Sequence, residues 1–398
     1  MNRKISIKIL IAFVGLTILL IFNSLPAKFD SFLFSSFNLI SGEIQPDSSI
    51  VIIHVTSQDI EQLGPWPLKR SYYALLINNL NKYGVKKIGL EIFLSSKFVS
   101  QTIYDNVLQR EIGRANNVVL SSIAGSLVKH DGIFTTDSLS YPSPKLINEN
   151  IPTGHINYFQ DRGIEIPLKI FNQNEFEKAF CIGLISGKDD YPGKIKINIS
   201  SSWNKFNNYS LVQFLQSVQD NDEKLLNLKN KFVIIGISDP QLAASFSTTF
   251  DEQLPGVALH AFALDNLLNN RFINDNYYQL SKYLLFIIAF ALIILLIKRT
   301  KIIRYYAILF LSSLILTFVL YKLLYLEIAY SFLFIPFLFV FASDIYFMLI
   351  EKNNELTGYY NESEILKKLL AEKEKALLYL ETELSNSASQ KTNILLKK

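Results

Sequence analysis

Six residues carry the chemistry with which this chain could recognise a ligand: Asp59, Trp66, Arg70, Glu91, His155 and His260. Catalysis is not indicated, because we find no P-loop, no glycine-rich dinucleotide loop after a strand, no GxSxG and no HExxH motif. The four histidines also lack the spacing of metal ligands. We therefore expect ligand recognition without a catalytic residue, a metal or a cofactor.

The turn around Trp66 has both a structural and a functional interpretation. The stretch GPWP bends the chain rigidly, because both prolines fix φ and neither donates a backbone hydrogen bond. Trp66 either lines a ligand cleft or pins this turn onto the core. Asp59 and Arg70 flank the turn, and their structural alternatives are a helix cap and a surface charge. Glu91 ends a strand, where open parallel sheets place ligand groups, but a buried, capping or arginine-paired carboxylate is an equal alternative.

The two candidate histidines lie on regular elements. His260 shares one helical face with Val257, Ala261 and Leu264, so its ring is expected to point toward a sheet. It also lies in the first turns of its helix, where the positive end of the helix dipole disfavours imidazolium. A core histidine satisfied by one hydrogen bond is the structural alternative. His155 opens a strand and has the same two interpretations.

An α/β unit positions the turn and Glu91. Ile50–Val55 and Lys87–Ile92 have the composition of buried strands, and an amphipathic helix lies between them. One face of that helix is predicted to carry Tyr72, Leu75, Leu76, Leu80 and Tyr83, and Gly84 suits its C-terminal cap. This strand–helix–strand order predicts two parallel strands.

Similar elements continue to residue 270. Further strands are predicted at 117–123, 154–159, 164–171, 194–200 and 230–238, and further helices at 101–115, 174–185, 209–218 and 256–270. The polar stretch 129–152 is expected to be a surface excursion. The run at 230–238 is continuously apolar, as in strands buried on both faces of a parallel sheet. These elements predict a three-layer α/β domain with a mostly parallel sheet.

Apolar segments outside this domain predict a membrane protein. Four segments approach the length of a bilayer-crossing helix, one N-terminal and three C-terminal: 9–22, 283–297, 305–320 and 328–350. Lysine and arginine at 298–304 and before the first segment favour cytoplasmic placement of both termini. The chain then divides into a signal anchor at 1–22, an extracytoplasmic domain at 23–279, three spans at 280–350 and a tail at 351–398. A cleaved signal ending near Ala27 is the alternative for the first segment.

Charge and cysteine content argue against a nucleic-acid-binding protein and against a domain held by intrachain disulfides. Residues 23–279 carry 22 basic and 25 acidic side chains, a net −3, so the remainder of the +4 chain is +7. The basic excess therefore belongs to the membrane-flanking segments, and no nucleic-acid partner is expected. Cys181 is the only cysteine, so no intrachain disulfide can form, and its apolar surroundings predict a buried small side chain.

Three stretches together resemble the CHASE type-2 sensory domain. They are DIEQLGPWPLKRSYYALLINNLNKYGVKKIGLEIF, GHINYFQDRG, and FVIIGIS followed by LPGVALHAFALDNLLNN, within residues 28–345. The resemblance implies an extracytoplasmic sensor of the kind found on bacterial cyclases, histidine kinases and Ser/Thr kinases. Two departures lie where a ligand would be read. Glu91 replaces the more usual Asp, and 238–250 lacks the usual glycine, so ligand identity does not carry over.

The tail has a heptad pattern. Leucines fall at its core positions, namely Leu356, Leu366, Leu370, Leu377, Leu380 and Leu384, with Tyr359 among them and Ser363 and Lys373 as interruptions. This pattern favours a short parallel coiled coil and a homodimer, and a solvated single helix is the alternative.

The sequence thus predicts a multi-pass sensor in a bacterial inner membrane. It would detect an extracytoplasmic ligand and pass the signal across the lipid bilayer to a separate cytoplasmic partner. Only 48 residues follow Ile350, fewer than an effector domain needs, so we expect no enzymatic activity. The alternatives are the sensory half of a truncated or split receptor and a non-signalling scaffold that binds envelope components.

Overall fold

A computed structural model describes residues 10–11, 13–15, 17–18, 21–22, 24–97, 103–130, 132–148, 150–173, 175–185, 191–296 and 302–395. The chain forms two compact units. The larger contains Leu19–Ile287 and Leu309–Leu333, and the smaller contains Met1–Ile18, Ile288–Ile308 and Phe334–Lys398.

A seven-stranded sheet forms the centre of the larger unit. Its order is β13 (Asn207–Ser210), β1 (Ile50–Val55), β14 (Phe232–Ile237), β2 (Lys87–Leu90) and β3 (Val118–Ala124), and β3 also pairs with β7 (Thr153–His155) and β6 (Leu139–Ser140). Every pairing is parallel except that of β6. The apolar runs of β1 and β14 occupy neighbouring central positions, so their side chains are buried on both faces. The predicted α/β class is confirmed.

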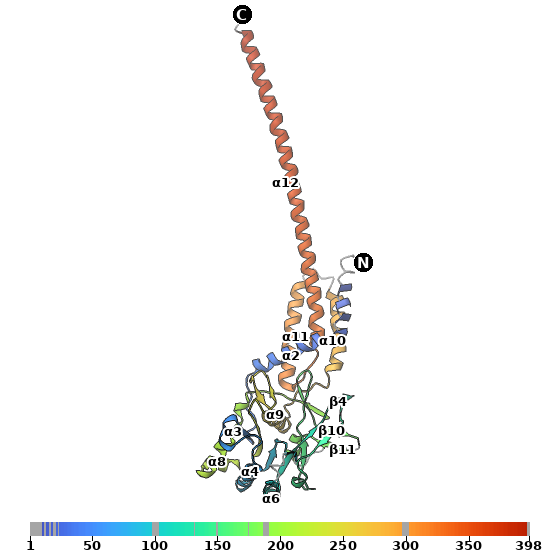
Figure 1. Cartoon of the computed structure of the whole chain (residues 1–398). Helices are drawn as coiled ribbons and strands as arrows, with labels where there is room; N and C mark the ends of the chain where they lie inside the picture. Colours follow the sequence, from blue (N-terminus) through green and yellow to red (C-terminus); the bar gives the residue numbers. More distant parts are fainter. Residues whose placement is uncertain are drawn as a thin grey trace. The chain divides into compact units, whose positions relative to one another are not determined.

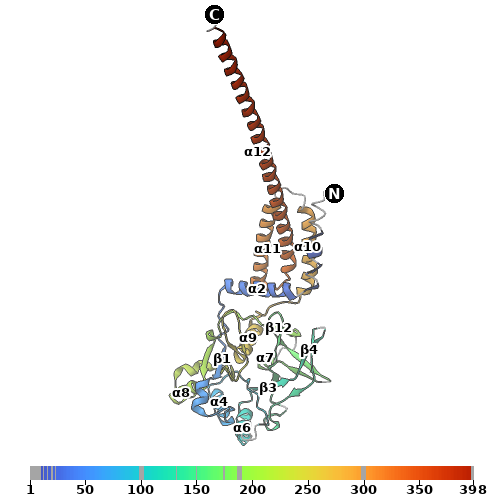
Figure 2. The ribbon, with the colours of Figure 1, turned by 45° about the horizontal axis from the view of Figure 1, so that its top comes forward.

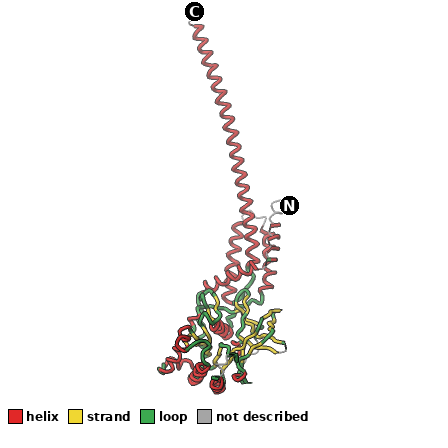
Figure 3. Tube along the Cα trace, viewed as in Figure 1, coloured by secondary structure: helices red, strands yellow, loops and turns green. Residues whose placement is uncertain are grey.

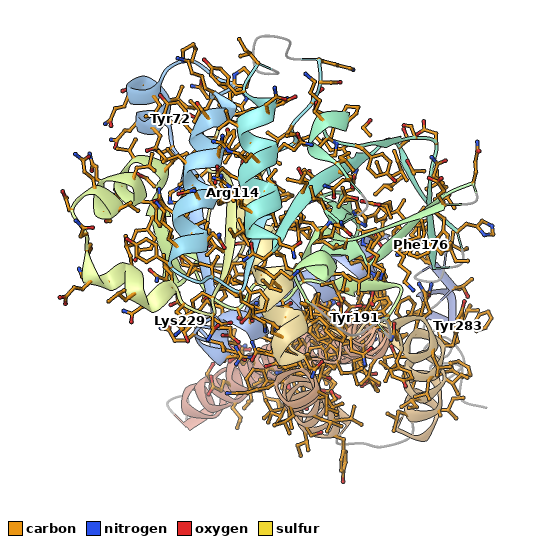
Figure 4. All side chains as sticks on the ribbon, turned by 90° about the horizontal axis from the view of Figure 1, so that it is seen from below. Tyr72, Arg114, Phe176, Tyr191, Lys229 and Tyr283 are labelled. Carbon is orange, nitrogen blue, oxygen red and sulfur yellow. The ribbon has the colours of Figure 1, made fainter. Side chains whose placement is uncertain are left out.

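Helices cover both faces of this sheet. Val51 and Ile53 pack toward α4 (Arg70–Lys82), α6 (Asp105–Ala115) and α8 (Leu211–Gln219). Ile50 and Ile52 point the other way, toward α7 (Phe180–Leu184) and α9 (Gly256–Asn269). Figure 4 shows α4 and α6 side by side, with Tyr72 and Arg114 labelled on them. Alternation along the strands thus divides the apolar residues between two cores.

The buried face of α4 differs from the predicted one. Tyr73, Leu76, Ile77 and Leu80 are buried, whereas Leu75 is exposed. The prediction placed the apolar face about one residue away because Tyr72 and Tyr83 fit the same helical period. Both tyrosines are in fact only partly buried.

Three smaller sheets complete the domain. One contains β4 (Leu127–His130), β5 (Ile133–Thr136), β10 (Lys169–Asn172) and β11 (Glu175–Lys178), and another contains β8 (Phe159–Gln160), β9 (Ile164–Pro167) and β12 (Lys194–Lys196). The third is β15 (Ser245–Phe246) with β16 (Leu254–Pro255). In Figure 1, β4, β10 and β11 lie together, away from α3 (Ser57–Leu63) and α8. Short 3-10 turns are η1 (Pro144–Leu146), η2 (Trp203–Lys205) and η3 (Glu223–Leu228).

Four sequence predictions in this region are wrong. The predicted excursion at 129–152 contributes β4, β5 and β6. The single strand expected at 154–159 is two strands, β7 and β8, in different sheets. The single strand expected at 164–171 is likewise two strands, β9 and β10, in different sheets. The helix expected at 174–185 is β11 followed by the short α7, because residues 175–178 pair antiparallel with β10.

The helices outside the α/β elements are α2 (Ser24–Ser41), α10 (Tyr278–Leu296), α11 (Ile302–Leu324) and α12 (Ser331–Leu395). Among the described residues, two helices are long and apolar enough to cross a membrane, α11 over Ala307–Leu324 and α12 over its apolar part. The apolar helix Tyr278–Ile294 is shorter. The segment at 9–22 falls partly outside the described residues, so the count of four spans stays a prediction.

The tail is helical and continuous with the last apolar segment. α12 is one helix of 65 residues, with Pro336 inside it. Figure 3 shows its tail as an uninterrupted helix. The leucines of the heptad pattern, among them Leu370 and Leu377, are exposed in the single chain. The coiled coil therefore stays a prediction. The helix α2 was not predicted, because 24–41 was assigned to the outer domain without an element.

Candidate ligand-binding site

A pocket of about 350 Å³ lies beyond the carboxyl ends of β2 and β14. Its wall contains the GPWP turn, the start of α4, the segment that follows β2, part of 237–246 and the start of α9. We call it the Glu91 pocket. Four of the six candidate residues line it: Trp66, Arg70, Glu91 and His260. Pockets of this size suit small molecules, and the end of a parallel sheet is a common place for them.

Glu91 directly follows β2, and its backbone N–H extends the sheet by donating to Ile235 O at 2.8 Å. Its carboxyl group lies against two glycines, because a Cβ on Gly236 would be 2.5 Å from Oε2 and a Cβ on Gly256 would be 3.4 Å from Oε1. Glu91 lies deep in the domain and keeps accessible surface where it lines the pocket. Burial raises its pKa to about 8, although the Ile237 backbone N–H opposes the shift. Glu91 is therefore mostly neutral at physiological pH.

Arg70 is the only lysine or arginine among the lining residues that the structure describes. Its guanidinium donates to the Asp105 carboxylate and to the Ser95 carbonyl. Ser143 donates to the same carboxylate at 2.9 Å. Arg70 and Asp105 are both buried, so a surface charge, the structural alternative for Arg70, is wrong. The pair neutralises its own charge and fixes the segment after β2, and Glu91 is left without a cationic partner in the described lining.

Two aromatic residues form the wall near the turn. Trp66 lines the pocket and also packs against the core under α4. Its position therefore fits both predicted roles, lining a cleft and pinning the turn onto the core. Tyr73, from the first turn of α4, is almost fully buried and lines the same pocket. Its hydroxyl has no hydrogen-bond partner among the described residues. A buried hydroxyl of this kind is costly unless a water or a ligand satisfies it.

His260 forms part of the far wall. Burial lowers its pKa to about 4, against a hydrogen bond to the Ile156 backbone, so the imidazole is neutral at physiological pH. Its Nδ1 lacks a hydrogen-bond partner in the part of the chain that the structure describes. His155, on β7, is fully buried outside the lining. Burial and the nearby His260 lower its pKa to about 3, so both imidazoles are neutral, His155 in the core and His260 in the pocket wall.

Asp59 is a cap and does not line the pocket. Its carboxylate accepts from the Thr56 backbone N–H at 2.7 Å, within a capping box at the start of α3. The other oxygen accepts from the Val212 N–H at 2.9 Å in the first turn of α8. One buried carboxylate thus satisfies two helix N-termini, which is the structural alternative for this residue.

Several lining residues were not singled out from the sequence. Phe93 follows Glu91, Tyr158 lies after β7, and Leu242 and Phe246 come from 238–250. The rings of Tyr158 and Phe246 meet edge to face at 4.8 Å. The sequence feature that could have indicated Leu242 and Phe246 is that 238–250 lacks the glycine usual in similar domains. Within the described residues, no group of three or more His, Cys, Asp or Glu could hold a metal.

Comparison with family models identifies the domain. The model described as CHASE2 domain matches residues 9–297, which include the whole sheet and the pocket. The chain belongs to the CHASE2 domain family. CHASE2 domains are extracytoplasmic sensory domains, so the resemblance in the sequence is confirmed. Searches of curated proteins and of solved structures found no match to this CHASE2 chain.

Proposed function

We propose that this CHASE2 protein is a membrane-embedded receptor whose Glu91 pocket binds a small organic cation. The observation that carries the proposal is a carboxyl group that has no cationic partner among the described lining residues, in a cavity whose described wall is mostly apolar and aromatic. The aromatic lining residues are Trp66, Tyr73, Phe93, Tyr158 and Phe246. Aromatic faces attract organic cations, and an ionised Glu91 supplies the opposite charge.

The cost of ionising Glu91 at neutral pH is modest. A pKa of about 8 lies roughly one unit above neutral pH, and one unit corresponds to about 1.4 kcal/mol. A cation that enters the pocket releases the Glu91 proton and takes its place as the partner of the carboxylate. An anionic ligand gains nothing from Glu91 in its ionised form.

The membrane topology that we propose has both termini in the cytoplasm and the CHASE2 domain outside. Support comes from the apolar helices α11 and α12, from the family's extracytoplasmic placement, and from the lysines and arginines at 298–304. Four crossings satisfy this arrangement.

The receptor transmits its signal through α12 and does not act as an enzyme. Support for this route is the continuity of α12 from Ser331 into the tail and the heptad pattern of the tail. Two tails of a homodimer would pair, and a change in their pairing would be read by a separate cytoplasmic protein.

Tryptophan fluorescence of the full-length protein in nanodiscs tests the pocket. Replacement of Trp203 by Phe leaves Trp66 as the only tryptophan. Benzyltrimethylammonium should change Trp66 emission more strongly than benzyl alcohol, and benzoate least. Its affinity should rise by up to about tenfold per pH unit as pH approaches about 8, because binding displaces one proton. The probe carries a fixed charge, so only the protein titrates.

The matched variant is Glu91→Gln, which keeps the shape of the side chain and removes its charge. It should bind benzyltrimethylammonium at least about tenfold more weakly and without pH dependence. Equal binding of the cation and benzyl alcohol, or an unchanged Glu91→Gln variant, would reject an organic cation as the ligand class.

A further inference from the structure

The helix α2 exposes an apolar stripe. The fractional exposures along it are 64% for Leu25, 71% for Phe32, 59% for Leu39 and 71% for Ile40. The first three residues are seven positions apart and fall on one side of the helix, with Ile40 beside them. An apolar face of this size on an 18-residue helix needs a partner.

The other sides of α2 are already occupied. Asn38 donates to the Ile199 carbonyl at 2.7 Å, and Ser31 donates to the Arg162 carbonyl at 3.2 Å, which attaches one side to the domain. Phe34 and Phe37 pack on another side, against Phe318 and Tyr321 of α11. The four stripe residues take no part in these contacts, and two of them, Phe32 and Leu39, border a hollow that Thr248 of the domain also lines.

Three of the residues that α2 contacts lie at helix ends. Tyr278 and Ser331, the first residues of α10 and α12, both donate to Asp30. Tyr321 belongs to the last turn of α11, which ends at Leu324. Figure 2 shows α2 lying across the end of α11 and not along it. Because the end of a spanning helix marks the surface of the bilayer, α2 lies at the level of that surface.

We propose that α2 is an interfacial helix whose stripe of Leu25, Phe32, Leu39 and Ile40 inserts into the outer leaflet of the membrane. The partner is the lipid surface itself. Amphipathic helices of this kind bury their apolar face at the boundary of headgroups and acyl chains. The inference rests on the membrane embedding proposed above and is independent of the ligand.

Lipid explains the exposed surface better than a second copy of the chain does. Leu280 of α10 and Leu323 and Leu324 of α11 are also largely exposed, and they lie near the helix ends that α2 meets. The apolar surface of α2 is thus accompanied by exposed apolar surface on two different helices. One bilayer covers all of it, whereas a protein partner would have to match each helix separately.

Depth-dependent quenching of a fluorophore tests the insertion. The full-length protein with Cys181→Ala receives a single cysteine at Phe32 or Ile40, is labelled with nitrobenzoxadiazole and is placed in phosphatidylcholine–phosphatidylglycerol vesicles. Lipids with a doxyl group near the headgroup should quench both labels, and aqueous iodide should quench them several-fold less than an exposed site. The aqueous control is Leu226→Cys, whose native side chain is similarly exposed at 67% on η3 of the domain.

A label at Leu311→Cys on α11 separates the two proposals, since doxyl groups deep in the acyl chains should quench it if α11 spans the bilayer. Absence of that quenching rejects the membrane embedding itself. Quenching at position 311 combined with full iodide access at 32 and 40 rejects the interfacial helix alone. Labels at 32 and 40 that are shielded from both iodide and doxyl lipid, with crosslinking between copies at these cysteines, would assign the stripe to a dimer interface.

Discussion

The carboxylate of Asp30 accepts two hydrogen bonds from Ser331, one from the backbone N–H and one from the hydroxyl, each at 2.8 Å. Tyr278 donates to the same carboxylate at 2.7 Å. Asp30 is fully buried and lies 301 positions before Ser331 in the sequence, so one residue of α2 fixes the first residue of α12. A buried carboxylate is tolerated there because three donors and the start of a helix surround it.

Replacement of Asp30 by Asn should change how stability depends on pH. Burial raises the pKa of Asp30 from 3.8 to about 6, against the hydrogen bonds from Tyr278 and Ser331. Folding therefore takes up a proton between these values, and the contribution of Asp30 to stability grows as pH falls through about 6. Relative to Asp30→Asn, the wild-type melting temperature should rise on acidification from about pH 7 to about pH 4.5. A constant difference between the two proteins would contradict this.

Replacement of Glu91 by Gln should stabilise the protein while it weakens binding. The folded-state pKa of about 8 lies above the ordinary 4.5, so the wild type loses stability as pH rises between these values. Glutamine has no proton to lose, and Glu91→Gln should be the more stable protein at about pH 8 and above, by a few kcal/mol at most. Thermal unfolding at several pH values measures this. A variant that loses both stability and binding would indicate a packing role for Glu91.

Removal of one partner from the buried Arg70–Asp105 pair should destabilise the domain strongly. In Asp105→Ala the Arg70 charge stays buried without its carboxylate, at a cost of about 3–5 kcal/mol. The exposed pair Lys205–Glu43, 3.2 Å apart, is the control, and Glu43→Ala should cost less than about 1 kcal/mol. Denaturant unfolding compares the two variants. Equal effects would show that the buried pair does not brace the pocket.

The tail should form crosslinks on one side only. With Cys181→Ala as background, cysteine at Leu370 or Leu377 lies at a core position of the heptad and should form disulfides between copies in the membrane. Cysteine at Lys375 falls on the outer side and should not. Leu370→Glu should abolish the ligand-dependent response of the cytoplasmic partner protein, and the variant should still insert into the membrane. Disulfide formation at all three positions, or normal signalling by Leu370→Glu, would leave the tail as a solvated helix.

Much of the central fold could be predicted because its signals are local. β1 and β14 are continuous apolar runs, and only strands buried on both faces need them. Residues 174–185 misled the prediction because their spacing fits a helix, whereas Phe176 meets Phe171 across the β10–β11 pair, with ring centres 6.1 Å apart. Tertiary pairing decided that segment. α2 could not be predicted from period alone, because its buried residues face partners about 250–300 positions away.

The site was predictable where it follows a strand or a turn. Glu91 ends β2 and Trp66 lies in the rigid GPWP turn, so position alone indicated both residues. Tyr158 and Phe246 reach the pocket from irregular segments, for which the sequence carries no periodic signal. Asp59 and His155 are of residue types common in binding sites, but tertiary contacts give them structural roles. Asp59 caps helices, and His155 is buried in the core.

The continuity of α12 also gives the receptor an angular constraint. Each residue of an α-helix advances the direction of its side chain by about 100°. No loop interrupts the tail part of α12, so within the tail the direction of each side chain depends on the number of residues before it. A single inserted residue would rotate every leucine beyond it away from the seam. In the proposed receptor, the length of α12 therefore determines, together with the ligand, how the two tails pair.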